Sequence, residues 1–298
     1  MHCGIFAAAS LEHVFKCFGK QPALEDVTLS VESGKVTALL GPNGAGKTTA
    51  ISLLLGLAAP QQGRVQVLGG SPHDLQIRRR VGVMLQSAAL PDTLRVREVL
   101  QLVCGYYPNP LPLPRLAALT GLSRHLSVPY ARLSGGQQRR VQFALAICGN
   151  PELLFLDEPT TGLDVEAREA LWSVVRELTA QGCAILLTTH YLEQAEALAQ
   201  RVAVLVRGRI VSDGSVDEMR ARGARRRIRC VSTLPVEQVR SWDGVTGASR
   251  EQQWLDIEGV AAEPIVRRLL AADPQLRELE VRRSGLAEAF VRITREAA

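Results

Sequence analysis

A glycine-rich turn, GPNGAGKTT at residues 41–49, constrains the fold of this chain more than any other feature. It fits the pattern G-x-x-x-x-G-K-[ST], with Lys47 and Thr48 at its end. A strand-like run, KVTALLG, precedes it, and a helix-like run, TTAISLLLGL, follows it. Glycines let backbone N–H groups converge on phosphate oxygens, and the following helix points its N-terminal dipole at the same anion. We therefore predict a strand–loop–helix unit that binds a nucleoside triphosphate.

The residues of this turn have distinct predicted roles. Lys47 places a cation on the β- and γ-phosphates, and Thr48 gives a hydroxyl to Mg²⁺. The predicted nucleotide-binding residues of the turn are Gly41, Pro42, Asn43, Gly44, Ala45, Gly46, Lys47, Thr48 and Thr49.

A second run, LLFLDEP at residues 153–159, supplies acidic partners for this turn. Its apolar residues predict a buried strand, and the acids emerge at the carboxyl end, where open α/β sheets bind ligands. Successive strand side chains face opposite ways, so Asp157 and Glu158 have different tasks, one at a metal and one at a water. The two runs predict an ATP or GTP site with Mg²⁺, which kinases, GTPases and helicases share.

The chain as a whole has the pattern of an α/β fold with a parallel-rich core sheet. After GLD, the run at 165–178 has a helical apolar face, with Asp164 as its N-cap. Strands alternating with helices predict a largely parallel sheet wrapped in helices. The predicted strands are 35–41, 64–70, 81–86, 153–159, 184–190 and 201–208.

Residues 87–150 predict a mostly helical insertion between two strands of this sheet. Its YYPNPLPLP segment at 106–114 carries prolines at alternate positions, which disfavour a helix. We interpret the segment as a stiff connector, with a polyproline ligand as the alternative.

The insertion also contains LSGGQQRR at 133–140, which predicts a second anion site. Ser134, Gly135 and Gly136 precede an amphipathic helical pattern, and a hydroxyl with free backbone donors at a helix N-terminus binds anions. One nucleotide does not need two cradles. Either the insertion folds over its own site, or the second cradle serves another copy of the chain across a two-fold axis.

The order of these motifs resembles the ABC-type ATPase cassette over roughly residues 11–220. LSGGQ lies between the phosphate loop and LLFLDEPTTGLD, and TTH follows. The resemblance implies a homodimer or heterodimer with ATP and Mg²⁺ between subunits, each capped by the partner's Ser134, Gly135, Gly136 and Gln137.

The resemblance also implies individual roles. Glu158 is the general base and Asp157 holds Mg²⁺, while Gln86 touches the metal and the attacking water. Asp164 communicates across the dimer, and His190 contacts the γ-phosphate. An aromatic residue that stacks on adenine falls at Phe18 or at the rival Phe15; we choose Phe18, where the family more often has tyrosine.

Several segments resemble the ABC-2 export branch, which includes drug and antibiotic resistance pumps. These are THYLEQAEALAQRVAVLVRGRIVSDGS, VGVMLQSAALPDTLRVREVLQL and GLAEAFVRIT. The resemblance implies a peripheral subunit at the cytoplasmic face of the membrane that powers an ABC-2 permease. We expect the permease to be a separate chain, because no apolar run in this sequence reaches the length of a membrane span. The cargo stays open among drugs, antibiotics and lipid-like molecules, and the alternative is a soluble ABC ATPase without a transport role.

Residues 1–220 form the predicted ATPase domain, and 221–298 form a C-terminal accessory α+β domain. The order strand, helix, hairpin, helix, strand resembles the ferredoxin-like split motif. The domain is interpreted as regulatory, dimer-supporting or passive, and the Arg-rich run at 220–229 as a solvated linker or a lipid contact. The net charge of +5 is concentrated there, so we expect no nucleic-acid partner. The six cysteines show no metal-binding spacing.

Overall fold

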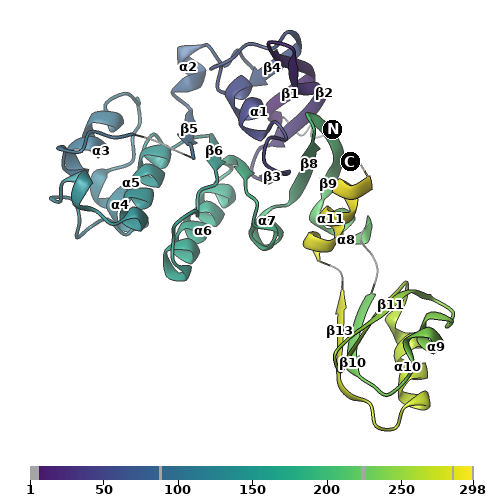
Figure 1. Ribbon diagram of the computed structural model, residues 1–298. Helices are drawn as coiled ribbons and strands as arrows, with labels where there is room; N and C mark the ends of the chain where they lie inside the picture. The colour runs from purple at the N-terminus through teal and green to yellow at the C-terminus, as the bar shows by residue number, and fades with distance from the viewer. Residues whose placement is uncertain (1–6, 87–88, 223–225, 284, 297–298) are drawn as a thin grey trace, which may run out of the picture. The chain divides into compact units, whose positions relative to one another are not determined.

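A computed structural model describes residues 7–86, 89–222, 226–283 and 285–296, and it separates the chain into two compact units (Figure 1). The first unit ends at Ser215, and the second spans Val216–Glu296. The predicted boundary near residue 220 falls inside helix α8 (Val216–Arg222), which packs against α11 (Leu286–Glu296) in the second unit. The difference arises because α8 follows the last strand of the ATPase sheet without a break in the sequence pattern.

The central sheet of the first unit has the strand order β5-β6-β7-β3-β8-β9 in the part of the chain that the structure describes. All neighbouring strands from β5 to β8 in this order, including β3, pair in parallel, and β9 is an antiparallel edge strand. β3, β6 and β7 are buried along their whole length, as expected for parallel strands covered on both faces. The predicted parallel-rich α/β fold is therefore confirmed. The bounds are β3 Val36–Leu40, β5 Val81–Met84, β6 Leu153–Asp157, β7 Ala184–Thr188, β8 Arg201–Val206 and β9 Arg209–Ser215.

A second, antiparallel sheet packs against this core and has the order β2-β1-β4. Its strands are β1 (Ala7–Phe18), β2 (Gln21–Glu32) and β4 (Gln62–Val67). Strands β1 and β2 were not predicted. The strand expected at 64–70 corresponds to β4, which lies in this sheet and not in the core sheet. The register of β1 against β2 shifts around His13, which has a positive φ of 50°, so the apolar alternation of β1 is broken at a bulge.

The helices that pack on the first unit's sheets follow the apolar pattern of the sequence. In α1, Ala50, Ile51, Leu53 and Leu54 are buried in one cluster with Phe155 of β6. In α6, the predicted N-cap is present, because Asp164 Oδ1 accepts a hydrogen bond from Ala167 N at 2.7 Å. The bounds are α1 Lys47–Leu54, α2 Leu75–Arg78, α6 Val165–Ala180 and α7 Leu192–Leu198.

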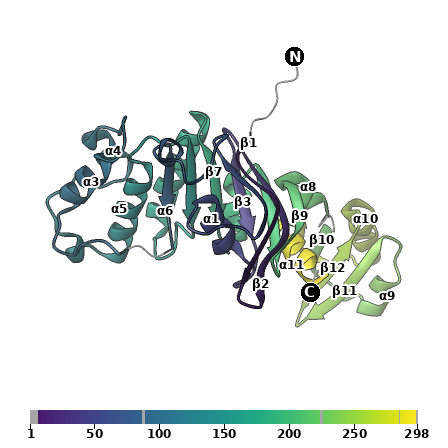
Figure 2. The same ribbon diagram turned by 90° about the horizontal axis from the view of Figure 1, so that it is seen from above.

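A group of helices lies between β5 and β6 in the sequence and gathers at one end of the first unit (Figures 1 and 2). These are α3 (Val96–Cys104), α4 (Leu113–Leu119), the short 3₁₀ helix Tyr130–Arg132 and α5 (Gly135–Ile147). The last proline of the run at 106–114, Pro114, lies in the first turn of α4 rather than outside a helix. A proline is tolerated there, because the first turn has no intrahelical acceptor for its missing N–H.

Strand β5 lies so close to α5 that only glycine fits at Gly82. A Cβ at this position would lie 2.0 Å from the carbonyl oxygen of Ala146. We expect Gly82→Ala to lower the free energy of unfolding by roughly 1–3 kcal/mol, because the backbone of β5 or α5 must shift. Gly135→Ala, on the same helix, is the control for stability, because its Cβ would meet nothing within 4 Å. Chemical denaturation of both variants measures the difference, and equal stabilities would contradict this packing.

The second unit contains an antiparallel sheet in the order β11-β12-β10-β13 over its described residues. Between α8 and α11, the elements of this unit follow along the chain as β-α-β-β-α-β. Ile228, Leu255 and Ile257 are buried in one cluster with Val239 of α9 and Leu269 of α10. The bounds are β10 Arg226–Val231, α9 Val236–Arg240, β11 Val245–Glu251, β12 Trp254–Gly259, α10 Ala262–Ala272 and β13 Arg277–Arg283.

Part of the Arg-rich run at 220–229 is a strand and not a linker. Arg227 Nε donates to Asp256 Oδ1 at 3.0 Å, and the Arg229 guanidinium lies 4.6 Å from the centre of the Trp254 ring. Residues 223–225 of the run lie outside the described part of the chain. Among the residues described, none of the helices combines the length and apolar character that crossing a bilayer requires.

Candidate nucleotide-binding site

Residues 41–46 connect β3 to α1, and two glycines allow this turn to lie close to neighbouring backbone. A Cβ at Gly41 would lie 2.2 Å from Leu205 O, and one at Gly46 would lie 2.5 Å from Ala23 O. Gly46 also has a φ of 108°, where side chains other than hydrogen are strained. These contacts explain why the chain has glycine at both positions.

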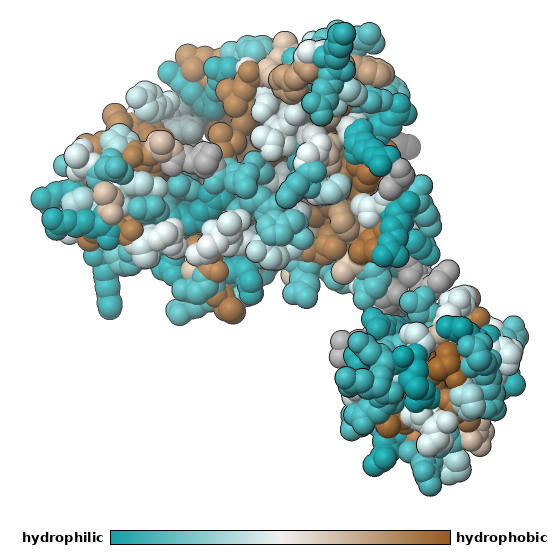
Figure 3. All heavy atoms as spheres, viewed as in Figure 1, coloured by the Kyte–Doolittle hydropathy of each residue, from teal (hydrophilic) through white to brown (hydrophobic). Residues whose placement is uncertain are grey.

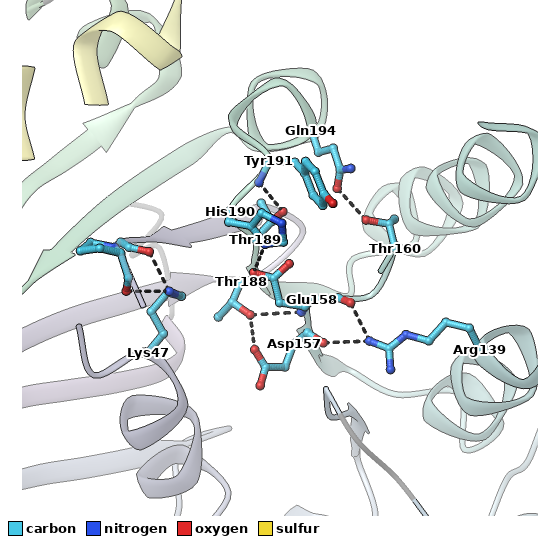
Figure 4. Close-up of polar contacts among 12 residues, drawn as sticks. Lys47, Arg139, Asp157, Glu158, Thr160, Thr188, Thr189, His190, Tyr191 and Gln194 are labelled. Atoms are coloured by element: carbon cyan, nitrogen blue, oxygen red, sulfur yellow. Dashed lines mark hydrogen bonds and ion pairs between the residues drawn. The ribbon is translucent and has the colours of Figure 1, made fainter. Parts of the chain in front are cut away.

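Lys47 lies at the first position of α1 and reaches back into the turn (Figure 4). Its Nζ donates to the carbonyl oxygens of Gly41 at 2.7 Å and Pro42 at 3.1 Å. Burial lowers the pKa of Lys47 from its ordinary value, and the nearby carboxylates of Glu158 and Asp157 oppose that shift. The ammonium group is thus held where anions are attracted both by its charge and by the helix N-terminus.

Asp157 and Glu158 lie where β6 ends, beside the end of β7 (Figure 4). The hydroxyl of Thr188 donates to Asp157 Oδ1 and accepts from Glu158 N at 3.3 Å. Glu158 has a φ of 49°, a left-handed conformation that few residues other than glycine adopt. Such strain persists only where neighbouring groups fix the backbone, and it is concentrated at functional sites.

The Glu158 side chain is buried and faces His190. His190 Nδ1 lies 2.9 Å from Glu158 Oε1, and its side chain is 52% exposed, while that of Glu158 is 11% exposed. The Tyr191 ring packs on the His190 ring with 4.0 Å between their centres. The other carboxylate oxygen, Glu158 Oε2, is buried without a hydrogen-bond partner among the described residues. A buried acceptor without a donor is the group that a positioned water would satisfy.

The LSGGQ segment forms the N-terminus of α5. Ser134 is the N-cap: its Oγ accepts from Gln137 N at 3.3 Å, and Gln137 Oε1 accepts from Ser134 N at 3.0 Å. The Gln137 amide nitrogen lies 2.9 Å from His125 Nε2, a histidine to which the sequence assigned no role. Ser134 and Gly135 are exposed. This helix therefore presents its N-terminal donors to solvent, as an anion site requires.

Arg139 connects α5 to the two segments that end β5 and β6. Its guanidinium donates to the carbonyl oxygens of Asp157 at 3.1 Å and Glu158 at 2.6 Å (Figure 4). It also donates to the carbonyl oxygen of Gln86 at 3.1 Å. Arg139 is buried, and burial lowers its pKa from the ordinary value, opposed by Asp157 and Glu158. Sequence reasoning missed this residue because an arginine after an amphipathic helix start is typical of an exposed helix face.

The remaining predicted residues have different surroundings. Gln86 follows β5 with an exposed side chain. Phe18 ends β1 with 59% of its surface exposed, and Lys16 Nζ lies 5.3 Å from its ring centre, whereas the rival Phe15 is half-buried. Asp164 uses its carboxylate as the cap of α6.

A further buried contact was also not predicted: Thr160 Oγ1 donates to Gln194 Oε1 at 2.8 Å. It ties the segment after Glu158 to α7, which follows His190. The helical pattern at 192–198 does not reveal it, because glutamine is usually exposed.

Comparison with known proteins identifies this arrangement. The sequence pattern of the ABC transporter family matches residues 24–161, which include both Lys47 and Glu158. The daunorubicin resistance ATP-binding protein DrrA3 of Streptomyces coeruleorubidus is 34% identical over 312 residues, covering 96% of each chain. The Nod factor export ATP-binding protein I of Ralstonia nicotianae is 38% identical over 217 residues, covering 70% of this chain and 68% of that protein.

Solved structures agree with the sequence comparison. An ATP-binding subunit of an ABC transporter is 32% identical, with a TM-score of 0.67 over 72% of this chain and 92% of that chain. A bacterial ABC transporter cassette solved as a dimer is 25% identical, with a TM-score of 0.63 over 70% of this chain and 98% of that chain. The chain belongs to the ABC transporter family, in which it is an ATP-binding subunit that hydrolyses ATP.

Proposed function

We propose that this subunit dimerises around two ATP molecules and drives export through a separate ABC-2 permease. In each composite site, one protomer contributes Lys47, Asp157, Glu158 and His190, and the other contributes the Ser134 segment. The observation that carries this proposal is that Ser134 and Gly135 are exposed at the N-terminus of α5, whereas Lys47 and the carboxylates gather at the carboxyl end of the sheet. A second protomer is the simplest source of a cap, as the dimeric relative supports.

The residues present fit a Mg²⁺ ion, which would neutralise charge on the β- and γ-phosphates. Thr48, Gln86 and Asp157 offer oxygen atoms, the ligands that this hard cation prefers, and phosphates complete such sites. Asp157 is held at the strand end by the Thr188 hydroxyl. Lys47 and the main-chain N–H groups of 41–49 bind the phosphates, and Phe18 stacks on the adenine.

In the hydrolytic step, Glu158 orients and deprotonates the attacking water. Its Oε2, which has no hydrogen-bond partner within the described ranges, accepts the water's hydrogen. Its Oε1 holds the His190 ring, which contacts the γ-phosphate. Asp164 and the Ser134 segment join the partner's site. Loss of the γ-phosphate removes the anion that both protomers bind, so the dimer opens.

The permease binds, in this proposal, at an apolar groove on the first unit. The groove has a volume of about 360 Å³ and lies between α1, α2 and β5. In Figure 3, hydrophobic residues gather between the helical insertion and the part of the chain around α1 and α2. Leu57 and Leu85 line it, and Leu85 immediately precedes Gln86. An amphipathic helix of the permease would fit such a groove and would contact the segment that leads into the ATP site.

The peripheral position and the direction of transport rest on the relatives. DrrA3 covers nearly all of this chain, including the C-terminal unit, and its name refers to drug resistance. We therefore place the subunit at the cytoplasmic face of the membrane and its cargo among drugs, antibiotics or lipid-like molecules. No comparison favours a non-transport ATPase. The C-terminal unit is an accessory domain of ferredoxin-like type that supports or regulates the dimer.

Transport in inside-out membrane vesicles tests the export proposal. Vesicles that contain the chain and its permease should accumulate daunorubicin, the first probe, or another drug or lipid from a panel when ATP is added. The contradicting result has two parts. Inside-out vesicles supplied with ATP would take up none of the probes, and right-side-out vesicles would take up a probe, which would indicate import.

A variant of the groove tests the permease contact. Leu57 is 67% exposed, so Leu57→Glu should leave the fold and the ATPase rate of the isolated chain within about twofold of wild type. Transport and copurification with the permease should fall by roughly tenfold or more, since a charge enters an apolar contact. Leu270→Glu, at a 55% exposed leucine of α10, is the matched control and should have neither effect. Undiminished copurification of the Leu57 variant would exclude this groove.

A further inference from the structure

Arg139 is 7% exposed, a degree of burial that arginine rarely shows without a compensating role. Its Nη1 donates to Leu85 O and Gln86 O at 3.1 Å each, and to Gln142 Oε1 at 2.8 Å. Its Nε donates to Pro159 O at 3.2 Å. A planar guanidinium with donors on two edges can join two backbone segments in this way, and a single-point cation cannot.

The two segments that Arg139 joins belong to the same nucleotide site. One leads out of β5 into Gln86, and the other contains Asp157 and Glu158. The shortest of the contacts, 2.6 Å, is to the carbonyl of Glu158, the residue with the strained φ of 49°. Thr188 fixes the Glu158 N–H from the other side, with Thr188 O at 3.1 Å. Arg139 and Thr188 thus hold the backbone of Glu158 between them.

Arg139 lies on the helix whose N-cap is Ser134. In the proposed dimer, Ser134 contacts the ATP held by the partner, whereas Gln86 and Glu158 act on the ATP of their own protomer. A shift of α5 caused by the partner's nucleotide therefore reaches Glu158 through one side chain. The helix is continuous from Gly135 to Ile147, so it transmits such a shift as a rigid body.

We propose that Arg139 is a positioning residue that sets the backbone of Glu158 and couples the two ATP sites of the dimer. This inference rests on the proposed composite site. In this inference, the coupling passes through the interior of each protomer, from Ser134 along α5 to Glu158, as well as through contacts across the dimer interface. Loss of Arg139 should then slow the hydrolytic step and remove its cooperativity. The affinity for ATP, which the Lys47 turn provides, should not change.

The test uses the full-length chain with Arg139→Gln and Arg139→Lys. We expect kcat to fall by roughly 30- to 100-fold, because displacing a catalytic group by about 1 Å has effects of that order. The Hill coefficient for ATP should fall from above one in the wild type to about one in both variants, the value for uncoupled sites. The affinity for a fluorescent ATP analogue should stay within about threefold. Lysine keeps the buried charge, so Arg139→Lys serves the test if Arg139→Gln does not fold.

Arg250→Gln is the matched control, because Arg250 also donates to two carbonyls, Ser232 O at 2.8 Å and Leu234 O at 2.6 Å, but lies in the second unit. It should keep wild-type kcat and cooperativity. If the Arg139 variants remained as cooperative as wild type, the coupling role of Arg139 would be overturned and the composite site would not be affected. A wild-type chain with a Hill coefficient of one would also overturn the coupling, whereas failure of the composite site itself would show as no gain of hydrolysis when complementary variants are mixed.

Discussion

Glu158→Gln is expected to reduce ATP hydrolysis by roughly 10²- to 10³-fold while leaving ATP binding intact, since a general base contributes an effect of this size. Glutamine has the shape of glutamate but cannot take a proton from the attacking water. ATP therefore stays bound between the protomers, and the dimer accumulates. Phosphate release measures the first effect, and size-exclusion chromatography with ATP and Mg²⁺ measures the second.

Glu152→Gln is the control for this substitution. Glu152 immediately precedes β6, at the end opposite Glu158, and pairs with Arg80 on the surface, 2.6 Å between Glu152 Oε2 and Arg80 Nη2. Exposed pairs contribute little to stability, so this variant should hydrolyse ATP at the wild-type rate. If Glu158→Gln also hydrolysed ATP at the wild-type rate, Glu158 would not be the base.

Ser134→Asp is expected to reduce hydrolysis by roughly 10²-fold or more without weakening ATP binding to the isolated protomer. Aspartate is as good an N-cap as serine, so the start of α5 should keep its structure. Its negative charge, however, would face the partner's γ-phosphate and oppose closure of the dimer. Hydrolysis assays and titration with a fluorescent ATP analogue measure the two properties separately.

Ser134→Asn separates the effect of charge from that of shape. Asparagine caps helices as well as aspartate does but is neutral, so this variant should retain much more activity than Ser134→Asp. Equal losses in both variants would mean that the serine hydroxyl itself, and not the electrostatics of the cap, determines turnover. Normal hydrolysis in Ser134→Asp would remove the role of this segment in binding ATP.

The sequence predicted the core sheet and the motif residues because their physical constraints are local. Gly41, Lys47 and the acids after β6 are recognisable from a strand, a turn and a helix that follow each other directly. The sheet order and the antiparallel pair β1–β2 were not predictable in this way. Those strands contain polar residues and a bulge at His13, and the pairing depends on contacts with residues far along the chain.

The sequence motifs supplied candidate site residues, but they did not reveal the contacts that hold those residues in place. Arg139, Thr188 and Gln194 act through contacts between segments that are distant in sequence, and their residue types carry no special meaning where they stand. The left-handed backbone of Glu158 has the same origin. It arises from the tertiary contacts that close around the end of β6, and no property of glutamate predicts it.

The central claim is that each ATP is bound jointly by the Lys47 turn of one protomer and the Ser134 segment of the other, and mixed dimers test it most directly. Lys47→Ala and Ser134→Asp chains are each expected to be inactive alone. Mixed in equal amounts, half of the dimers combine both chains, and each of these has one intact composite site and one doubly defective site. We predict that mixing restores hydrolysis, to at most about a quarter of the wild-type rate, the value for independent sites, and to less than that because the two sites are coupled.

The location of the bound nucleotide in the same mixture gives a readout that does not need turnover. An ATP analogue with a photoreactive group on its γ-phosphate should bind the Lys47-bearing chain and label residues 133–137 of the Lys47→Ala chain. No gain of hydrolysis on mixing, together with labelling confined to the Ser134→Asp chain that binds the analogue, would show that a protomer encloses its own ATP and would contradict the account.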